Sequence, residues 1–106
     1  MVFSNNRLIK SITKILSNNL PKIQKEIQET KELSHLLYKW GRTGHVSKAE
    51  KKIIKAQLLD ILKAIPALAI LIIPFGTLVL YLLIKMLPFN ILPSAFIENE
   101  DHEIND

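Results

Sequence analysis

The sequence contains no cysteine, which excludes disulfides and thiolate metal sites. Its three histidines, His35, His45 and His102, are not paired at the four-residue spacing of a helical metal site. A zinc site needs three or four ligands, so we expect no metal. No Ser/His/Asp set, glycine-rich phosphate loop or paired carboxylates can be assembled either. We therefore expect a protein that is not an enzyme, with no cofactor and no small-molecule substrate that the sequence identifies.

Basic residues are absent after Lys85, where the chain becomes acidic. The acidic residues near the end do not follow the alternating pattern of a calcium loop, and its central glycine is missing. We interpret residues 97–106 as a solvated, disordered tail. The acidic residues of this tail are Glu98, Glu100, Asp101, Glu103 and Asp106.

Charge is also absent from the twenty-one residues between Ala64 and Ile84. A helix of this length is about 31 Å long, close to the roughly 30 Å thickness of the bilayer interior. The alternative is the central helix of a soluble protein, which is also apolar on every side. The highly charged residues before it could cover one side of such a helix but hardly all of it. The run therefore favours a transmembrane helix, the span.

Pro74 lies in the middle of the span, where it removes a backbone donor and clashes with the preceding turn. The span is therefore expected to be kinked or to fold back as a re-entrant hairpin. Each half reaches only about 15 Å, enough to enter a membrane but not to cross it. Thr77 can bond a carbonyl one turn back in either arrangement. We favour a kinked crossing and keep the hairpin as the alternative.

The charge distribution predicts an orientation. Residues 1–63 hold thirteen Lys and Arg against five Asp and Glu, whereas residues 86–106 hold none against five. Basic residues near a span stay in the cytoplasm, so we predict a bacterial inner-membrane protein with its N-terminus inside and its C-terminus outside. The first twenty residues lack the apolar core of a signal peptide. Their basic, acid-free, amphipathic character also resembles a mitochondrial transit peptide, and a eukaryotic chain would then lie in the mitochondrial inner membrane.

Apolar spacing predicts amphipathic helices before the span, in an N-terminal region 1–46. The first runs from about Arg7, capped by Asn5 or Asn6, to Ser17, and Asn18-Asn19 with Pro21 closes it. The second runs from about Pro21 to Trp40 and ends at Gly41 and Gly44. Its expected apolar stripe consists of Ile23, Ile27, Leu33, Leu36, Leu37 and Trp40.

A membrane region is predicted over residues 47–96. Ser47 and Glu50 have the spacing of a capping box, which starts a surface helix over residues 48–65. Pro66 marks a bend into the span at 64–84. The segment 86–96 is apolar but interrupted by Pro88 and Pro93, so we expect it to lie at the far interface or to cover the end of the span. The fold class is thus all-α, with basic amphipathic helices followed by one kinked transmembrane helix.

Four lysines gather in the first turns of the surface helix: Lys48, Lys51, Lys52 and Lys55. The lysines can be interpreted in three ways. They can be the positive flank of the span, they can bind anionic lipids of the bilayer, or they can bind ribosomal RNA. Within the span the only polar side chains are Thr77 and Tyr81, so a monomer offers no ion path. Transport would need a homo-oligomer with these side chains along a path between subunits. A membrane-perturbing small protein is a further alternative.

The residues from Leu62 to Phe96 resemble the membrane region of the Letm family, the leucine-zipper/EF-hand-containing transmembrane proteins. The resemblance depends on a set of seven residues, the signature: Pro66, Pro74, Lys85, Pro88, Asn90, Pro93 and Phe96. It implies a single-pass inner-membrane protein linked to potassium or calcium exchange against protons and to ribosome association. Family members continue after the span into a large helical domain credited with ribosome binding, whereas this sequence ends ten residues after Phe96. We expect a non-enzymatic anchoring module whose basic N-terminal helices are the candidate surface for a ribosome.

Overall fold

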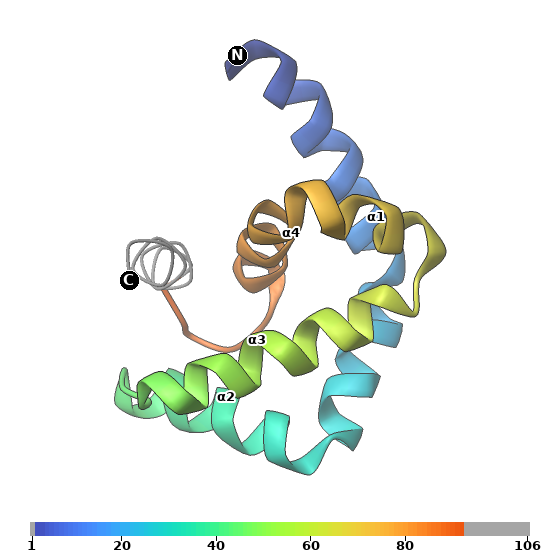
Figure 1. The fold of residues 1–106 in the computed structure, drawn as a ribbon. Coiled ribbons are helices and arrows are strands. Elements are labelled where there is room, and N and C mark those ends of the chain that lie inside the picture. The colour runs from blue at the N-terminus through green and yellow to red at the C-terminus, as the bar shows by residue number, and fades with distance from the viewer. Residues whose placement is uncertain (1, 93–106) are drawn as a thin grey trace.

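The computed structural model describes residues 2–92, and every regular element in this range is a helix. In chain order the helices are α1 (Val2–Glu29), α2 (Lys31–Thr43), α3 (Lys48–Lys63) and α4 (Pro66–Met86), as Figure 1 shows. The predicted all-α fold class is confirmed. The predicted acidic tail, the signature residues Pro93 and Phe96, and His102 lie outside the described residues.

α1 is one continuous helix, so the predicted break between Ser17 and Pro21 is wrong. The apolar stripe of this helix continues on both sides of Pro21 and is buried throughout, which holds the helix together across the proline. The Asn19 amide donates to the Ile15 carbonyl at 2.8 Å, within the helix. The buried members of the stripe are Ile12, Leu16, Ile23 and Ile27.

The break lies instead at Thr30, whose backbone is extended (φ −96°, ψ 94°). Its hydroxyl donates back to the Glu26 carbonyl at 3.0 Å, one turn earlier. All six residues of the stripe predicted for the second helix are buried, although Ile23 and Ile27 belong to α1 and the other four to α2. The spacing therefore identified the core face correctly and placed the helix boundary wrongly.

The turn between α2 and α3 depends on Gly44. Gly44 has φ 73°, in the left-handed region that glycine adopts without strain, and its N–H donates to the Trp40 carbonyl at 2.7 Å. Gly41, predicted to help end the helix, lies inside α2. The predicted capping box is confirmed, because Ser47 Oγ accepts from the Glu50 N–H at 3.0 Å and Glu50 Oε1 accepts from the Ser47 N–H at 2.8 Å.

α4 packs against α1 and α3. It begins with Pro66 in its first turn, directly after the extended Ile65, so the predicted bend at Pro66 is confirmed. The predicted kink is confirmed as well, because Phe75 leaves helical geometry (φ −131°, ψ 31°) next to Pro74. In Figure 1 the olive first half of α4 runs across the picture, whereas the orange second half is seen almost along its axis.

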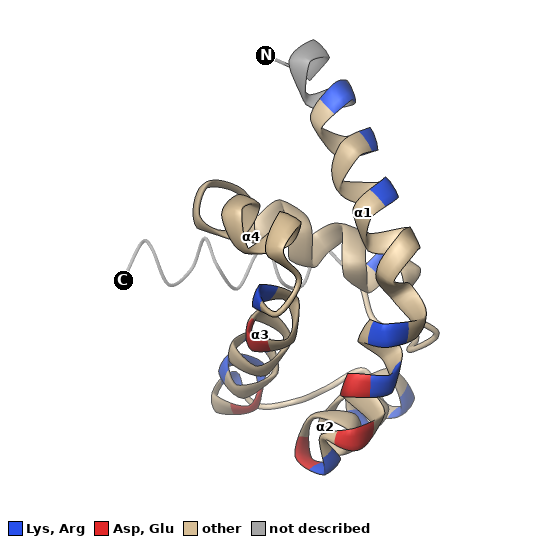
Figure 2. Cartoon of the chain, turned by 90° about the vertical axis from the view of Figure 1, so that its right-hand side faces the viewer, with Lys and Arg blue, Asp and Glu red and all other residues tan. Residues whose placement is uncertain are grey.

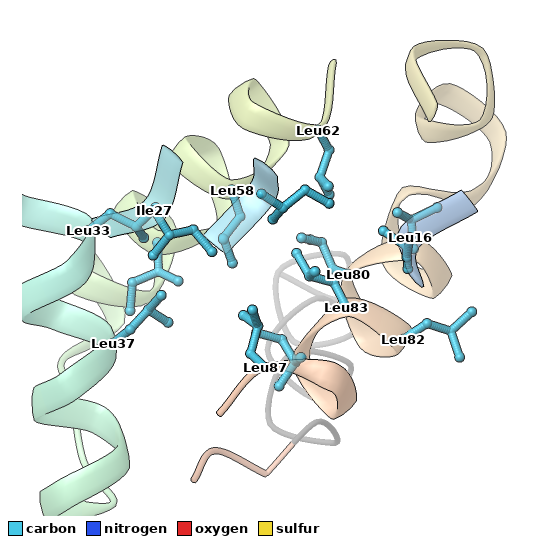
Figure 3. Packing of buried hydrophobic residues seen from close by; sticks show 14 of the residues in the cluster. Leu16, Ile27, Leu33, Leu37, Leu58, Leu62, Leu80, Leu82, Leu83 and Leu87 are labelled. Carbon is cyan, nitrogen blue, oxygen red and sulfur yellow. The ribbon is translucent and has the colours of Figure 1, made fainter. Parts of the chain in front are cut away.

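The core is shared by all four helices. Figure 3 shows Ile27 and Leu33 on one side facing Leu58 of α3, while Leu16 of α1 lies beside the second half of α4. α4 contributes buried side chains from both halves to this core. They are Leu68 and Ile72 before the kink and Val79, Leu80, Leu82, Leu83 and Ile84 after it.

The segment after α4, residues 87–92, returns to the end of α2. Leu87 and Ile91 are buried in the core, and the backbone of Asn90 lies against Gly41. Both ends of α4 therefore lie on the same body of amphipathic helices. The two positions predicted for this segment, at the far interface or over the end of the span, stay predictions.

Candidate functional site

The kink of α4 carries an exposed apolar surface, the elbow, which consists of Ile70, Ile73, Pro74 and Phe75. Ile73 is 90% exposed and Ile70 is 74% exposed, whereas their neighbours Leu68 and Ile72 are buried. Large aliphatic side chains rarely gather at full exposure on a protein that contacts only water. The elbow is therefore a candidate contact surface.

A hollow of about 730 Å³ lies beside the elbow, between α3 and α4. α3 contributes Lys55 and Leu59, and the two halves of α4 contribute the rest. The residues of α4 that line it are Ile72, Ile73, Pro74, Phe75, Gly76, Thr77, Leu78, Leu80 and Tyr81. The hollow is mostly apolar, and none of the described residues that line it carries a carboxylate.

The four predicted lysines do not all lie on one surface. Lys48 and Lys52 are exposed, and Lys55 borders the hollow. Lys51 turns toward the core, where its ammonium lies 5.7 Å from the centre of the Trp40 ring, a cation–π distance. Figure 2 shows charged residues on α1, α2 and α3 and almost none on α4.

Lys48, Lys52, Lys55 and Leu59 follow one another at intervals of four, three and four residues, so they form one stripe along α3. We call it the basic stripe. It leads from the α2–α3 turn to the hollow. The spacing was present in the sequence and could have identified the stripe, but the elbow beside it depends on how α4 folds back.

An ion pair fixes the start of α3 to α2. Lys39 Nζ lies 3.0 Å from Glu50 Oε2. The pKa of the Glu50 carboxyl lies below its usual value, first because the Ser47 backbone N–H donates to it and then because Lys39 donates to it. The Lys39–Glu50 pair therefore ties the first turn of α3 to α2 and fixes where the basic stripe begins.

The described signature residues serve separate structural purposes. Pro66 starts α4 and Pro74 kinks it, while the Lys85 ammonium lies 5.4 Å from the centre of the Tyr81 ring. Pro88 and Asn90 lie beside the end of α2, where they line a small pocket with Gly41. The structure does not gather these five residues into one site.

His35 and His45 are both exposed and lie on α2 and in the turn after it. Among residues 2–92, no group of three or more potential metal ligands comes together. α4 is the one described helix that is long and apolar enough to cross a membrane, judged by length and composition. Over the most apolar 18 residues of α4, 39% are buried in the structure, so most of this stretch is not covered by the rest of the chain.

The fold and surface thus define an all-helical protein with one kinked apolar helix beside a lysine-rich helix. A family model described as LETM1-like, RBD, the ribosome-binding domain, matches residues 46–105. The match covers more than half of the chain, so the chain belongs to the LETM1-like ribosome-binding domain family, which is not a known enzyme family. No protein of curated function and no solved structure matches the chain.

The suspected Letm relationship is therefore confirmed. The matched range includes α3, α4 and residues 87–92, which are the described parts of the region interpreted from the sequence as the membrane region. The sequence interpretation had separated that region from the ribosome-binding part of the family. The family match instead assigns this region, with α3 and α4 together, to the ribosome-binding domain, so the expectation that this domain follows the span is wrong.

Proposed function

We propose that this protein is a non-enzymatic adaptor that holds ribosomes close to a membrane. The elbow of α4 enters the lipid, and the outer end of the basic stripe contacts ribosomal RNA. The observation that carries the proposal is the direct junction of these two surfaces at the hollow, where Lys55 and Leu59 meet α4. Membership of the LETM1-like ribosome-binding domain family supports the ribosome as the proposed partner.

The membrane contact needs no separation of the helices. Each half of α4 is about 15 Å long, so the elbow can enter one leaflet while α1 and α3 keep the other side of α4 covered. The contact between Gly41 and Asn90 supports this arrangement, because it keeps both ends of α4 on one side. The predicted crossing, with the C-terminus outside, is the alternative and would require this contact to break.

The ribosome contact is electrostatic. Lys48 and Lys52 are exposed at the end of α3 that lies farthest along the chain from α4. Each lysine placed on a phosphate releases counterions, so binding weakens steeply as salt is raised. Contacts to phosphates carry no sequence information, so we expect the binding to depend on RNA shape and charge rather than on sequence.

The test is co-sedimentation of the full chain with purified ribosomes over a series of salt concentrations. We expect Lys48→Glu with Lys52→Glu to abolish most binding at moderate salt and to make the slope of log affinity against log salt shallower by about 1.5. The matched control is Lys10→Glu with Lys14→Glu, the same charge change on exposed positions of α1. Equal binding by the α3 variant and the wild type would refute the assignment of the ribosome surface.

Cation/proton exchange by an oligomer is a second candidate, because the kink places Thr77 and Tyr81 in the same hollow. Their hydroxyls, with carbonyls released at Pro74, could coordinate a cation between subunits. Purified protein reconstituted in vesicles tests this candidate. Potassium or proton flux that Thr77→Val abolishes would favour exchange over the adaptor function, and reconstituted protein without flux would eliminate it.

A further inference from the structure

We infer that the hollow between α3 and α4 binds one acyl chain of an anionic phospholipid, with the lipid phosphate held by Lys55. The inference rests on the membrane contact of the proposed function and adds a specific lipid site to it. It differs from general insertion of the elbow, because it assigns one lipid molecule to one cavity.

The size and lining of the hollow fit this ligand. Ligand cavities in proteins commonly measure about 300–1,000 Å³ and are lined mainly by apolar side chains with a few polar groups. The hollow, at about 730 Å³, lies within this range. Leu59, Phe75 and Leu78 give it apolar walls, and Thr77 and Tyr81 contribute hydroxyl groups.

The charge at the hollow selects an anionic head group. Among the described residues that line the hollow, Lys55 is the one with a cationic side chain. A lysine near a charged lipid surface contributes about 1 kcal/mol, which is a factor of about five in affinity. A cationic or neutral head group would gain nothing from the Lys55 ammonium group.

The position of the hollow makes a membrane lipid the source. The exposed Ile73 lines both the hollow and the elbow, so a protein whose elbow has entered a leaflet presents the hollow to the surrounding acyl chains. A lipid can then move one chain sideways into the hollow without leaving the membrane.

Gly76 offers a variant that fills the hollow without disturbing the fold. A Cβ at this position has as its nearest neighbour Ile72 Cγ2, at 3.9 Å, which is an ordinary contact distance. Gly76→Leu therefore projects a side chain into the space proposed for the ligand. The matched control is Ala67→Leu, which adds a similar side chain at an exposed position of α4 that does not line the hollow.

The first measurement is calorimetric titration of the full chain with alkyl phosphates below their micelle concentrations. We expect one molecule bound per chain and an affinity that rises about fourfold per methylene, the equivalent of about 0.8 kcal/mol for each buried CH₂. Dodecyltrimethylammonium should bind about fivefold more weakly than dodecyl phosphate. Gly76→Leu should weaken dodecyl phosphate binding by about tenfold or more, while Ala67→Leu should leave it unchanged.

The second measurement is native mass spectrometry of the chain released from nanodiscs that contain phosphatidylglycerol and phosphatidylcholine. We expect one retained phosphatidylglycerol on the wild type and on Ala67→Leu, and none on Gly76→Leu. Lys55→Gln should lose the preference for phosphatidylglycerol, whereas Lys63→Gln, an exposed lysine of α3 outside the hollow, should keep it.

Flotation with phosphatidylglycerol vesicles distinguishes the membrane contact of the elbow from the lipid site in the hollow. Gly76→Leu that still floats but retains no lipid supports both the membrane contact and the site. Equal lipid retention by Gly76→Leu and the wild type would overturn the site alone, as would binding of alkyl phosphates without retained phospholipid. A chain dimer that Gly76→Leu abolishes would assign the hollow to a second copy instead. Wild type that does not float would overturn the membrane contact.

Discussion

The backbone of Asn90 packs directly on Gly41, so close that a Cβ at position 41 would lie 3.2 Å from the Asn90 nitrogen. The two residues are 49 positions apart, and their contact joins the segment after α4 to the last turns of α2. A side chain at position 41 would force the backbone at Asn90 to move. The contact therefore explains why α2 carries a glycine inside the helix, where glycine costs helix stability.

The first prediction compares two glycines. Gly41→Ala should loosen residues 87–92 from α2, and the strain should cancel the roughly 1 kcal/mol that alanine gains over glycine in a helix. Gly76→Ala meets no close neighbour and should keep that gain, so its free energy of unfolding should exceed that of Gly41→Ala. Because Trp40 and Asn90 line the same pocket, Trp40 fluorescence should also change in Gly41→Ala alone. Chemical denaturation and emission spectra give both results, and equal gains from the two substitutions would contradict the close packing.

The second prediction concerns the start of α3. The folded-state pKa of Glu50 is depressed, so its stabilising effect is present above the usual pKa of the carboxyl and is lost as pH falls through the lower, folded-state pKa. The melting temperature of the wild type should therefore fall more steeply than that of Glu50→Gln in this acidic window. Thermal melting at a series of pH values measures the difference. Parallel profiles for the two proteins would show that protonation of Glu50 does not cause the loss of stability at low pH.

The third prediction separates the elbow from the core. Ile70→Ser with Ile73→Ser should change stability by less than about 1 kcal/mol, because both side chains are exposed, yet weaken binding to anionic vesicles by about tenfold or more. Leu58→Ala removes a fully buried side chain and should cost about 2–5 kcal/mol of unfolding free energy. Tyr38→Ser, an exposed residue on α2, is the matched control for vesicle flotation. Unchanged flotation of the double variant would remove the elbow as the lipid contact.

Local chemistry made part of this fold predictable. The capping box at Ser47 needs only the residues up to Glu50, and the kink needs only Pro74 within an apolar run. The apolar stripe from Ile23 to Trp40 was also readable, because burial follows helical spacing whether or not the helix is interrupted.

Tertiary packing decided the rest. Pro21 does not end α1, because a buried stripe runs past it on both sides. Gly44 rather than Gly41 ends α2, because Gly44 has the left-handed backbone conformation, whereas Gly41 allows the close approach of Asn90. The hollow joins Lys55 to Thr77 across two helices, so no single sequence segment indicates it. The four lysines at the start of α3 were visible in the sequence, but the turn of Lys51 away from the others and onto Trp40 was not.

The last prediction distinguishes elbow insertion from the crossing of α4. Because the chain has no cysteine, single cysteines can be introduced at His45 in the α2–α3 turn and at Leu92 after α4, both of them exposed positions. In sealed vesicles a membrane-impermeant maleimide should label both positions from the same side, since the contact between Gly41 and Asn90 keeps them together. Ile73→Cys, on the elbow, should be labelled in solution and protected once anionic vesicles are added. Labelling of His45→Cys and Leu92→Cys from opposite sides would establish the crossing, and it would mean that α4 leaves α1 and α3 when it enters the membrane.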